Sequence, residues 1–116
     1  MGTSIYSSMS FTKALDYIGT QVGRDITLRQ LHTLAVIVSA GPVGIDVTKV
    51  GEATQSSAAA VSRNVRVLGT HHYDRSKGEG MGLISIELDP LDNRRRLAKP
   101  TDKGVELLKR VLSMLN

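Results

Sequence analysis

Residues 82–104 read GLISIELDPLDNRRRLAKPTDKG. The stretch 83–88 is rich in β-branched residues and partly alternates apolar with polar side chains, which predicts a β-strand. Asp, Pro and Asn at 89–93 are typical of a turn, and 94–99 would form the returning strand. The segment therefore predicts a β-hairpin with three consecutive arginines at 94–96.

These arginines favour a contact with a polyanion. Neighbouring residues of a strand point to opposite sides, so at least one of Arg94, Arg95 and Arg96 can project into a DNA minor groove while another contacts phosphate. A nearby aspartate of the turn, which carries Asp89 and Asp92, could orient an arginine through a bidentate pair. A charged edge strand that only resists aggregation is the alternative interpretation.

A helix is predicted before the hairpin at 57–68, with Ser56 as its N-cap. Its buried side would hold Ala58, Val61, Val65 and Leu68. The opposite side combines small residues with Arg63 and Arg66. Short side chains let a helix approach a groove while guanidinium groups reach guanine edges or phosphates. An ordinary solvated helix face would look the same.

Further helices are predicted upstream. A short helix at 45–53, capped by Asp46 or Thr48, is separated by a tight turn from the helix at 57–68, and this is the outline of a helix-turn-helix. A helix before it begins at Thr27, with Gln30 completing a capping box. The first helix runs from a cap at Ser10 to Gly23, and its expected buried face is Phe11, Ala14, Leu15, Ile18 and Val22.

Thr101 is expected to cap a closing helix that carries two neighbouring apolar stripes. The first stripe is Val105, Leu108, Leu112 and Leu115, and the second is Leu107, Val111 and Met114. Together they span about half of the helix circumference, more than one packing contact requires. The surplus predicts a surface for dimerisation.

The composition bounds the class of protein. The chain has 116 residues, enough for one domain, and 41% of them are hydrophobic but only 3% aromatic. A formal charge of +4 is compatible with a polyanionic partner, and no cysteine is present. We see no secretory signal and no run of about 20 apolar residues, so we expect a cytoplasmic protein without membrane contact.

The segment 69–82 is polar and glycine-rich, and we expect a mobile loop there. His71 and His72 are adjacent in it and lack the spacing of metal ligands, so no metal site is predicted. No serine lies in a nucleophile motif and no cofactor motif is found. The sequence therefore predicts neither an enzyme nor a bound cofactor.

The order of these elements resembles that of the MarR family of winged helix-turn-helix regulators. The resemblance covers about 26–112 and is carried by TLRQL at 27–31, QSSAAAVSR at 55–63 and the hairpin segment. It implies a mainly α fold with a small β-hairpin, in the order α-α-α-α-β-β-α. We expect a single winged-helix domain over 1–116, whose terminal helices contribute to dimerisation.

The resemblance also implies site residues. The expected DNA-binding residues are Gln55, Ser56, Ser57, Ala59, Ser62, Arg63, Arg66, Asp92, Arg94, Arg95 and Arg96. Of these, Arg94 would enter the minor groove with Asp92 positioning it. The expected dimerisation residues are Phe11, Leu15, Ile18, Leu107, Val111, Met114 and Leu115. The implied function is transcriptional repression by a homodimer on double-stranded DNA, and a small aromatic effector is typical of the family.

Two alternatives stay open. A replication or partition factor of a phage or plasmid would use the same DNA-binding residues. A winged-helix module for protein contacts would use the 69–82 loop and the closing helix instead. Binding to random duplex at low salt separates the second alternative from DNA-binding proteins, because a pure protein adaptor would not bind.

Overall fold

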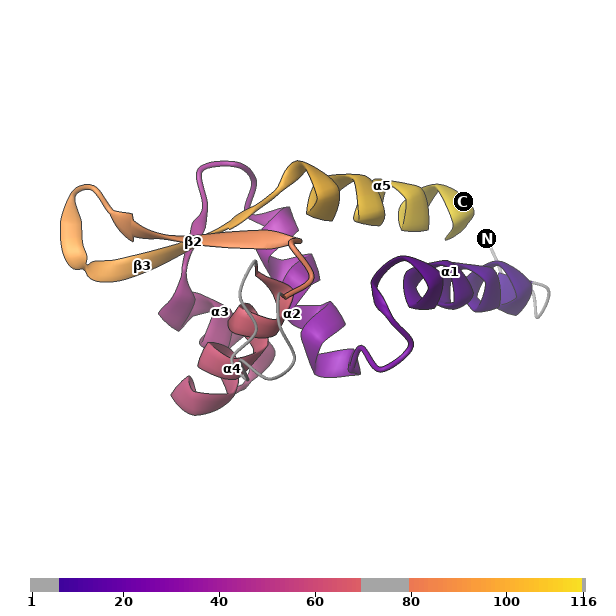
Figure 1. Ribbon diagram of the computed structural model, residues 1–116, viewed down its shortest axis with the longest axis horizontal. Helices are drawn as coiled ribbons and strands as arrows, with labels where there is room; N and C mark the ends of the chain where they lie inside the picture. The colour runs from indigo at the N-terminus through magenta and orange to yellow at the C-terminus, as the bar shows by residue number, and fades with distance from the viewer. Residues whose placement is uncertain (1–6, 70–79, 116) are drawn as a thin grey trace.

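The computed structural model describes residues 7–69 and 80–115 (Figure 1). Its elements follow in the order α1 (Ser7–Val22), α2 (Leu28–Ser39), β1 (Ile45–Asp46), α3 (Val47–Thr54), α4 (Ala58–Leu68), β2 (Ile84–Asp89), β3 (Asp92–Pro100) and α5 (Asp102–Leu115). The predicted class, mainly helical with a small hairpin, is confirmed. The structure adds the short strand β1, which the sequence did not predict.

Local capping fixes where α2 and α3 begin. The Thr27 hydroxyl accepts a hydrogen bond from the Gln30 backbone N–H at 3.1 Å, and the Gln30 side chain accepts one from the Thr27 N–H at 2.9 Å. This is the predicted capping box. Asp46 caps α3, because its carboxylate accepts a hydrogen bond from the Thr48 N–H at 2.8 Å.

The start of α4 differs by one residue from the prediction. Ser57 is the N-cap instead of Ser56, and its hydroxyl accepts a hydrogen bond from the Ala60 N–H at 3.2 Å. Ala58 is exposed although we expected it on the buried side. It is the first residue of α4, and the helix turns its buried side toward the core only from Val61 onward.

The three strands form an antiparallel sheet in the order β1-β3-β2. Ile45 pairs with Ala98, so the helix predicted from Ile45 begins two residues later. This pairing makes β3 the central strand of the sheet. The Thr101 N–H donates to the Leu83 carbonyl of the β2 side, so the missing N–H of Pro100 faces β1. Pro100 lies beyond Ala98, which pairs with the first residue of β1, so no ladder hydrogen bond is lost there.

The core lies where α2, α3 and α4 meet the sheet. Its fully buried apolar side chains are Leu34, Ile37, Val50, Leu68, Leu83, Ile84 and Ala98. They come from α2, α3, α4, both hairpin strands and the residue before β2. The core therefore anchors the helix-turn-helix and the hairpin to each other.

Helices α1 and α5 lie side by side at the other end of the molecule (Figure 1). Ala14 and Ile18 are buried there, but Phe11 and Leu15 are 54% and 46% exposed. The predicted buried face of the first helix is therefore only partly correct, because α5, its main packing partner, covers a narrow stripe. The helix also begins at Ser7, before the predicted cap at Ser10.

The connection from α4 to β2 is only partly described. The predicted 69–82 loop includes 70–79, with His71 and His72, which lie outside the described residues. Met81 and Leu83 donate backbone hydrogen bonds to the Val67 and Leu68 carbonyls at 2.9 and 2.8 Å. The last residues of the predicted loop are thus held against the end of α4.

Candidate nucleic-acid interface

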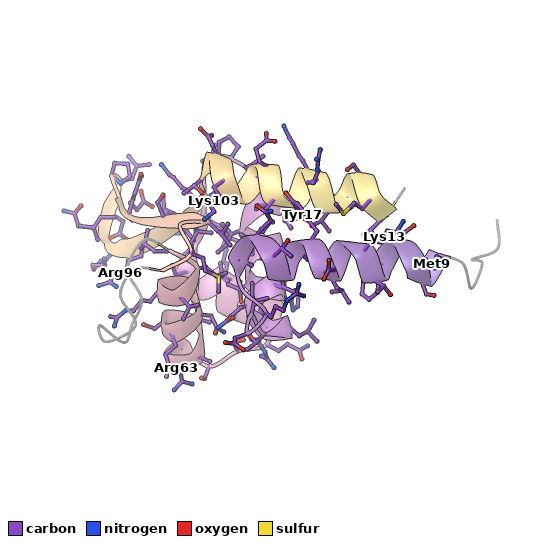
Figure 2. The ribbon with its side chains drawn as sticks, turned by 45° about the vertical axis from the view of Figure 1, so that its right-hand side comes forward. Met9, Lys13, Tyr17, Arg63, Arg96 and Lys103 are labelled. Carbon is purple, nitrogen blue, oxygen red and sulfur yellow. The ribbon has the colours of Figure 1, made fainter. Side chains whose placement is uncertain are left out.

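One side of α4 faces away from the protein body. Val61, Val65 and Leu68 bury the opposite side, while Arg63 and Arg66 are exposed. Ala59 is also exposed and Ser62 is half-buried. Figure 2 shows Arg63 pointing away from the body of the protein. The exposed side therefore has the small residues and the two cations that the sequence predicted.

The turn between α3 and α4 uses its polar residues internally. Gln55 ends α3 in the left-handed conformation, with φ of 53° and ψ of 45°. The Ser56 hydroxyl lies 2.8 Å from the Arg29 guanidinium and 2.9 Å from the Thr54 hydroxyl. The Ser57 hydroxyl caps α4 by accepting a hydrogen bond from the Ala60 N–H. Both serines thus have a structural role within the turn, and Arg29 is a residue of this region that the sequence reasoning missed.

The hairpin tip presents Arg94, whose side chain is 91% exposed. Its guanidinium nitrogens donate to both carboxylate oxygens of Asp92 at 3.2 and 3.4 Å, and its backbone N–H donates to Asp92 at 3.0 Å. These hydrogen bonds from Arg94 lower the pKa of Asp92. The bidentate pair expected from the sequence is present, and it restrains an otherwise free cation.

Arg95 is less exposed than Arg94, because it pairs with a carboxylate of the protein body. Its Nε lies 2.8 Å from the carboxylate of Asp46, whose side chain is only 15% exposed. The same carboxylate caps α3. The hydrogen bond from the Thr48 N–H lowers the pKa of Asp46 most, and the hydrogen bond from Arg95 lowers it further. The pair also raises the pKa of Arg95. A single aspartate therefore links the hairpin to the start of the helix-turn-helix.

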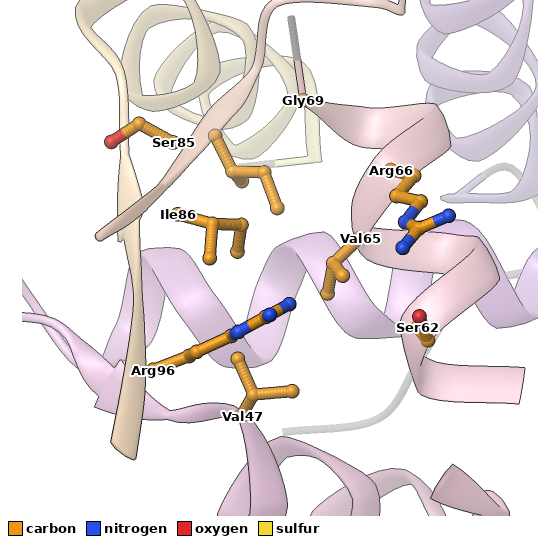
Figure 3. A pocket seen from close by; sticks show the side chains of 9 residues that line it. Val47, Ser62, Val65, Arg66, Gly69, Ser85, Ile86 and Arg96 are labelled. Atoms are coloured by element: carbon orange, nitrogen blue, oxygen red, sulfur yellow. The ribbon is translucent and has the colours of Figure 1, made fainter. Parts of the chain in front are cut away.

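Arg96 faces α4 across a cavity of about 370 Å³ (Figure 3). Ser62 and Arg66 line the α4 side of this cavity, and its apolar lining includes Val47, Val65 and Ile86. Within the described part of the chain, neither Arg66 nor Arg96 forms an ion pair. Helix α4 and the hairpin thus each contribute to one shared groove a cation that forms no ion pair with a described residue.

The residues predicted for dimerisation divide into two groups. Ile18 and Leu107 are 6% and 4% exposed, so they pack inside the single chain and do not contribute surface. Phe11, Leu15 and Leu115 are exposed, and Val111 and Met114 are half-buried. The structure adds two exposed residues to this region, Met9 of α1 and Leu112 of α5. Leu112 was already part of a predicted apolar stripe of the last helix.

The described elements define a winged helix-turn-helix protein, in which α3 and α4 form the helix-turn-helix and β2 and β3 form the wing. No protein-family model and no curated protein sequence matches the chain. Solved structures do match it. A DNA complex of MepR from Staphylococcus aureus is 24% identical with a TM-score of 0.71, over 92% of this chain and 77% of that chain.

Two further structures agree with this match. A MepR variant bound to an oligodeoxyribonucleotide is 26% identical with a TM-score of 0.68, over 95% of this chain and 70% of that chain. PcaV from Streptomyces coelicolor, in complex with its natural ligand, is 22% identical with a TM-score of 0.61, over 99% and 78%. The predicted MarR-like winged-helix fold is therefore confirmed. MepR and PcaV are named as transcription regulators, so the comparison gives no sign of an enzyme.

In 7–69 and 80–115, no three His, Asp or Glu side chains come together in a way that could hold a metal ion. No helix in these ranges is both long and apolar enough to cross a membrane.

Proposed function

We propose that this chain is a sequence-specific, double-stranded DNA-binding transcriptional regulator. The observation that carries the proposal is the shared groove, which Arg66 of α4 and Arg96 of the wing both line and where neither forms an ion pair with a carboxylate of the described residues. Two cations that approach one apolar-floored groove repel each other unless an anion lies near them. A DNA backbone that passes between recognition helix and wing supplies that anion. MepR, which has the same fold, has been crystallised in complex with DNA.

In this proposal α4 lies in the major groove and the wing lies at the minor groove. Arg63 points outward among small residues and would contact base edges. Arg94, held by Asp92, would enter the minor groove, and Ala59, Ser62 and Gln55 would line the approach. Arg95 would act indirectly, because Asp46 holds it against the start of α3.

We also propose a homodimer in which the exposed apolar residues of α1 and α5 meet those of a second copy. A two-fold dimer places two recognition helices about one helical turn, roughly 34 Å, apart on one side of the duplex. A dimer that covers its binding site in this way would act as a repressor. The exposed Phe11, Leu15 and Leu112 support this assembly.

A small-molecule effector is a further part of the proposal. MepR bound to ethidium bromide and PcaV bound to its natural ligand share the fold. The groove between α4 and the wing, about 370 Å³, is large enough for a small organic molecule. A ligand there would compete with DNA for the same cations.

Selection of bound sequences from a random duplex pool tests the function. We expect an enriched inverted repeat with half-sites about one helical turn apart, and an affinity that falls steeply with salt. Binding that stays equal for all sequences would favour a non-specific DNA-binding factor. No shift with any duplex at low salt would contradict the proposal and favour the protein-contact module.

A further inference from the structure

The side chain of Arg29 in α2 donates hydrogen bonds to the turn between α3 and α4. Its Nη1 lies 3.0 Å from the Thr54 carbonyl, 3.2 Å from the Gln55 carbonyl and 2.8 Å from the Ser56 hydroxyl. Three consecutive residues are therefore held by one side chain from a helix 25 to 27 positions earlier in the chain. No other described side chain has hydrogen bonds to both of these carbonyls.

Two of the three acceptors of Arg29, the carbonyls of Thr54 and Gln55, are groups that the end of α3 leaves without a helical partner. The last carbonyls of a helix lack intrahelical donors and carry a partial negative charge, which a guanidinium satisfies and stabilises. Thr54 is 4% exposed, so its carbonyl has little access to water. Gln55 then reverses the chain through a left-handed conformation, which fixes the direction of the turn.

The same contacts determine where α4 starts. Ser56 directly precedes the N-cap Ser57, so a shift of Ser56 moves the first turn of α4. The packing of α3 on α4 leaves little room, because a Cβ on Gly51 would lie 3.0 Å from Val61 Cγ2. The two helices can therefore approach closely only if the turn keeps its geometry.

We infer that Arg29 is a positioning residue that sets the placement of α4 relative to α2, and with it the base discrimination of the protein. Only the statement about base discrimination rests on the proposed function. The placement of α4 is a property of the free protein. The competing role for Arg29 is direct contact with a DNA phosphate. That role would change how steeply the DNA affinity falls with salt.

The experiment compares Arg29→Ala and Arg29→Lys with the wild-type chain, using Arg24→Ala as a matched control. Arg24 is likewise an exposed arginine held by a hydrogen-bond partner, the Asp16 carboxylate at 3.0 Å, but it lies outside the turn. Hydrogen exchange of the free proteins should show faster exchange at the 56–60 amides in Arg29→Ala, with unchanged exchange in β2 and β3. Arg29→Lys, which keeps a cation near the carbonyls, should restore slow exchange in part.

DNA binding is measured by fluorescence anisotropy on the selected duplex and on an unrelated duplex of equal length. We expect Arg29→Ala to lower the ratio of the two affinities about tenfold, the discrimination of one base contact, and to leave the salt slope unchanged. A uniform loss on both duplexes with a salt slope smaller by about 1 would show a phosphate contact and overturn the inference.

The two hypotheses can fail separately. If the wild-type chain binds no duplex, the proposed function fails, while faster 56–60 exchange in Arg29→Ala still supports the placement of α4. If exchange at 56–60 is unchanged in Arg29→Ala, the positioning role is wrong, whatever the wild-type chain binds.

Discussion

The three consecutive arginines of β3 have three different environments. Arg94 is paired with Asp92 at the exposed tip, Arg95 is bound to Asp46, and Arg96 faces α4. The sequence favours the first pair, because Asp92 and Arg94 are two positions apart, and the resemblance to the MarR family implies the same pair. It cannot predict the second, because Asp46 and Arg95 are 49 positions apart and only the pairing of β1 with β3 brings them together.

The Asp46 carboxylate makes the stability of the fold dependent on pH. Its folded-state pKa lies below the usual 3.8, so the unfolded chain takes up the proton first. The stabilisation is therefore present above pH 3.8 and is lost as the pH falls through the lower folded-state pKa. We expect Asp46→Ala to cost about 1 kcal/mol at pH 7 through the lost cap, measured by urea unfolding.

Asp46→Asn is the matched control, since asparagine keeps the capping oxygen but not the charge. Its loss should be smaller than that of Asp46→Ala and should shrink between pH 7 and pH 2. An Asp46→Asn loss that is equal at both pH values would show that the charge of Asp46, and thus its pair with Arg95, adds no stability.

Arg63 and Arg94 should differ in what their removal does to DNA binding. Arg63→Ala removes an outward cation of α4 and should relax base preference at one position of each half-site, by about tenfold. Arg94→Ala removes the wing-tip cation and should weaken binding to most sequences, with a smaller salt slope. Anisotropy titrations on the selected site and on single-base variants check both effects. Equal profiles for the two variants would contradict the assigned grooves.

Among the secondary-structure elements, the starts of α2 and α5 were predictable from local signals. The capping box at Thr27 and the cap at Thr101 each involve residues within three positions, and both are present. The two-residue strand β1 has no periodicity, so its pairing with β3 leaves no signal in the sequence. The exposure of Phe11 and Leu15 could not be predicted either, because it depends on which neighbours cover α1.

The same holds for the site. The exposed arginines of α4 and the pair of Arg94 with Asp92 follow from helical periodicity and short spacing. The hydrogen bonds of Arg29 and the groove between Arg66 and Arg96 join segments that are distant in the sequence. Tertiary packing alone brings these residues together.

The start of α5 explains the glycine of the TDKG stretch. A Cβ on Gly104 would collide with the carbonyl oxygen of Leu83, where Thr101 also bonds to the Gly82 carbonyl at 2.7 Å. Alanine favours a helix by about 1 kcal/mol over glycine, but a backbone collision in a packed site outweighs this. We expect Gly104→Ala to lower the free energy of unfolding by about 1–3 kcal/mol in urea. Lys109→Ala, at an exposed position of α5, should change it by less than about 0.5 kcal/mol.

At the scale of the whole molecule, the arginine groove and the apolar surface of α1 and α5 lie at different ends (Figure 1). The wing and α4 with their arginines lie at one end, and α1 and α5 extend to the other (Figure 1). That second end exposes Met9, Phe11, Leu15, Leu112 and Leu115. Large exposed apolar side chains on two adjacent helices are typical of a protein contact. A dimer formed there would leave both arginine-bearing ends free to reach one duplex.

This arrangement predicts that dimerisation and DNA affinity are lost together. We expect Phe11→Glu and Leu112→Glu to give monomers by light scattering, because each places a charge in the apolar contact. Lys109→Glu, which changes charge at an exposed position of α5, should stay dimeric. Affinity for the inverted repeat should fall about 100-fold or more in the monomers, since the second half-site no longer binds at high effective concentration. Affinity for a single half-site should be unchanged. Phe11→Glu and Leu112→Glu variants that remain dimeric would place the contact elsewhere.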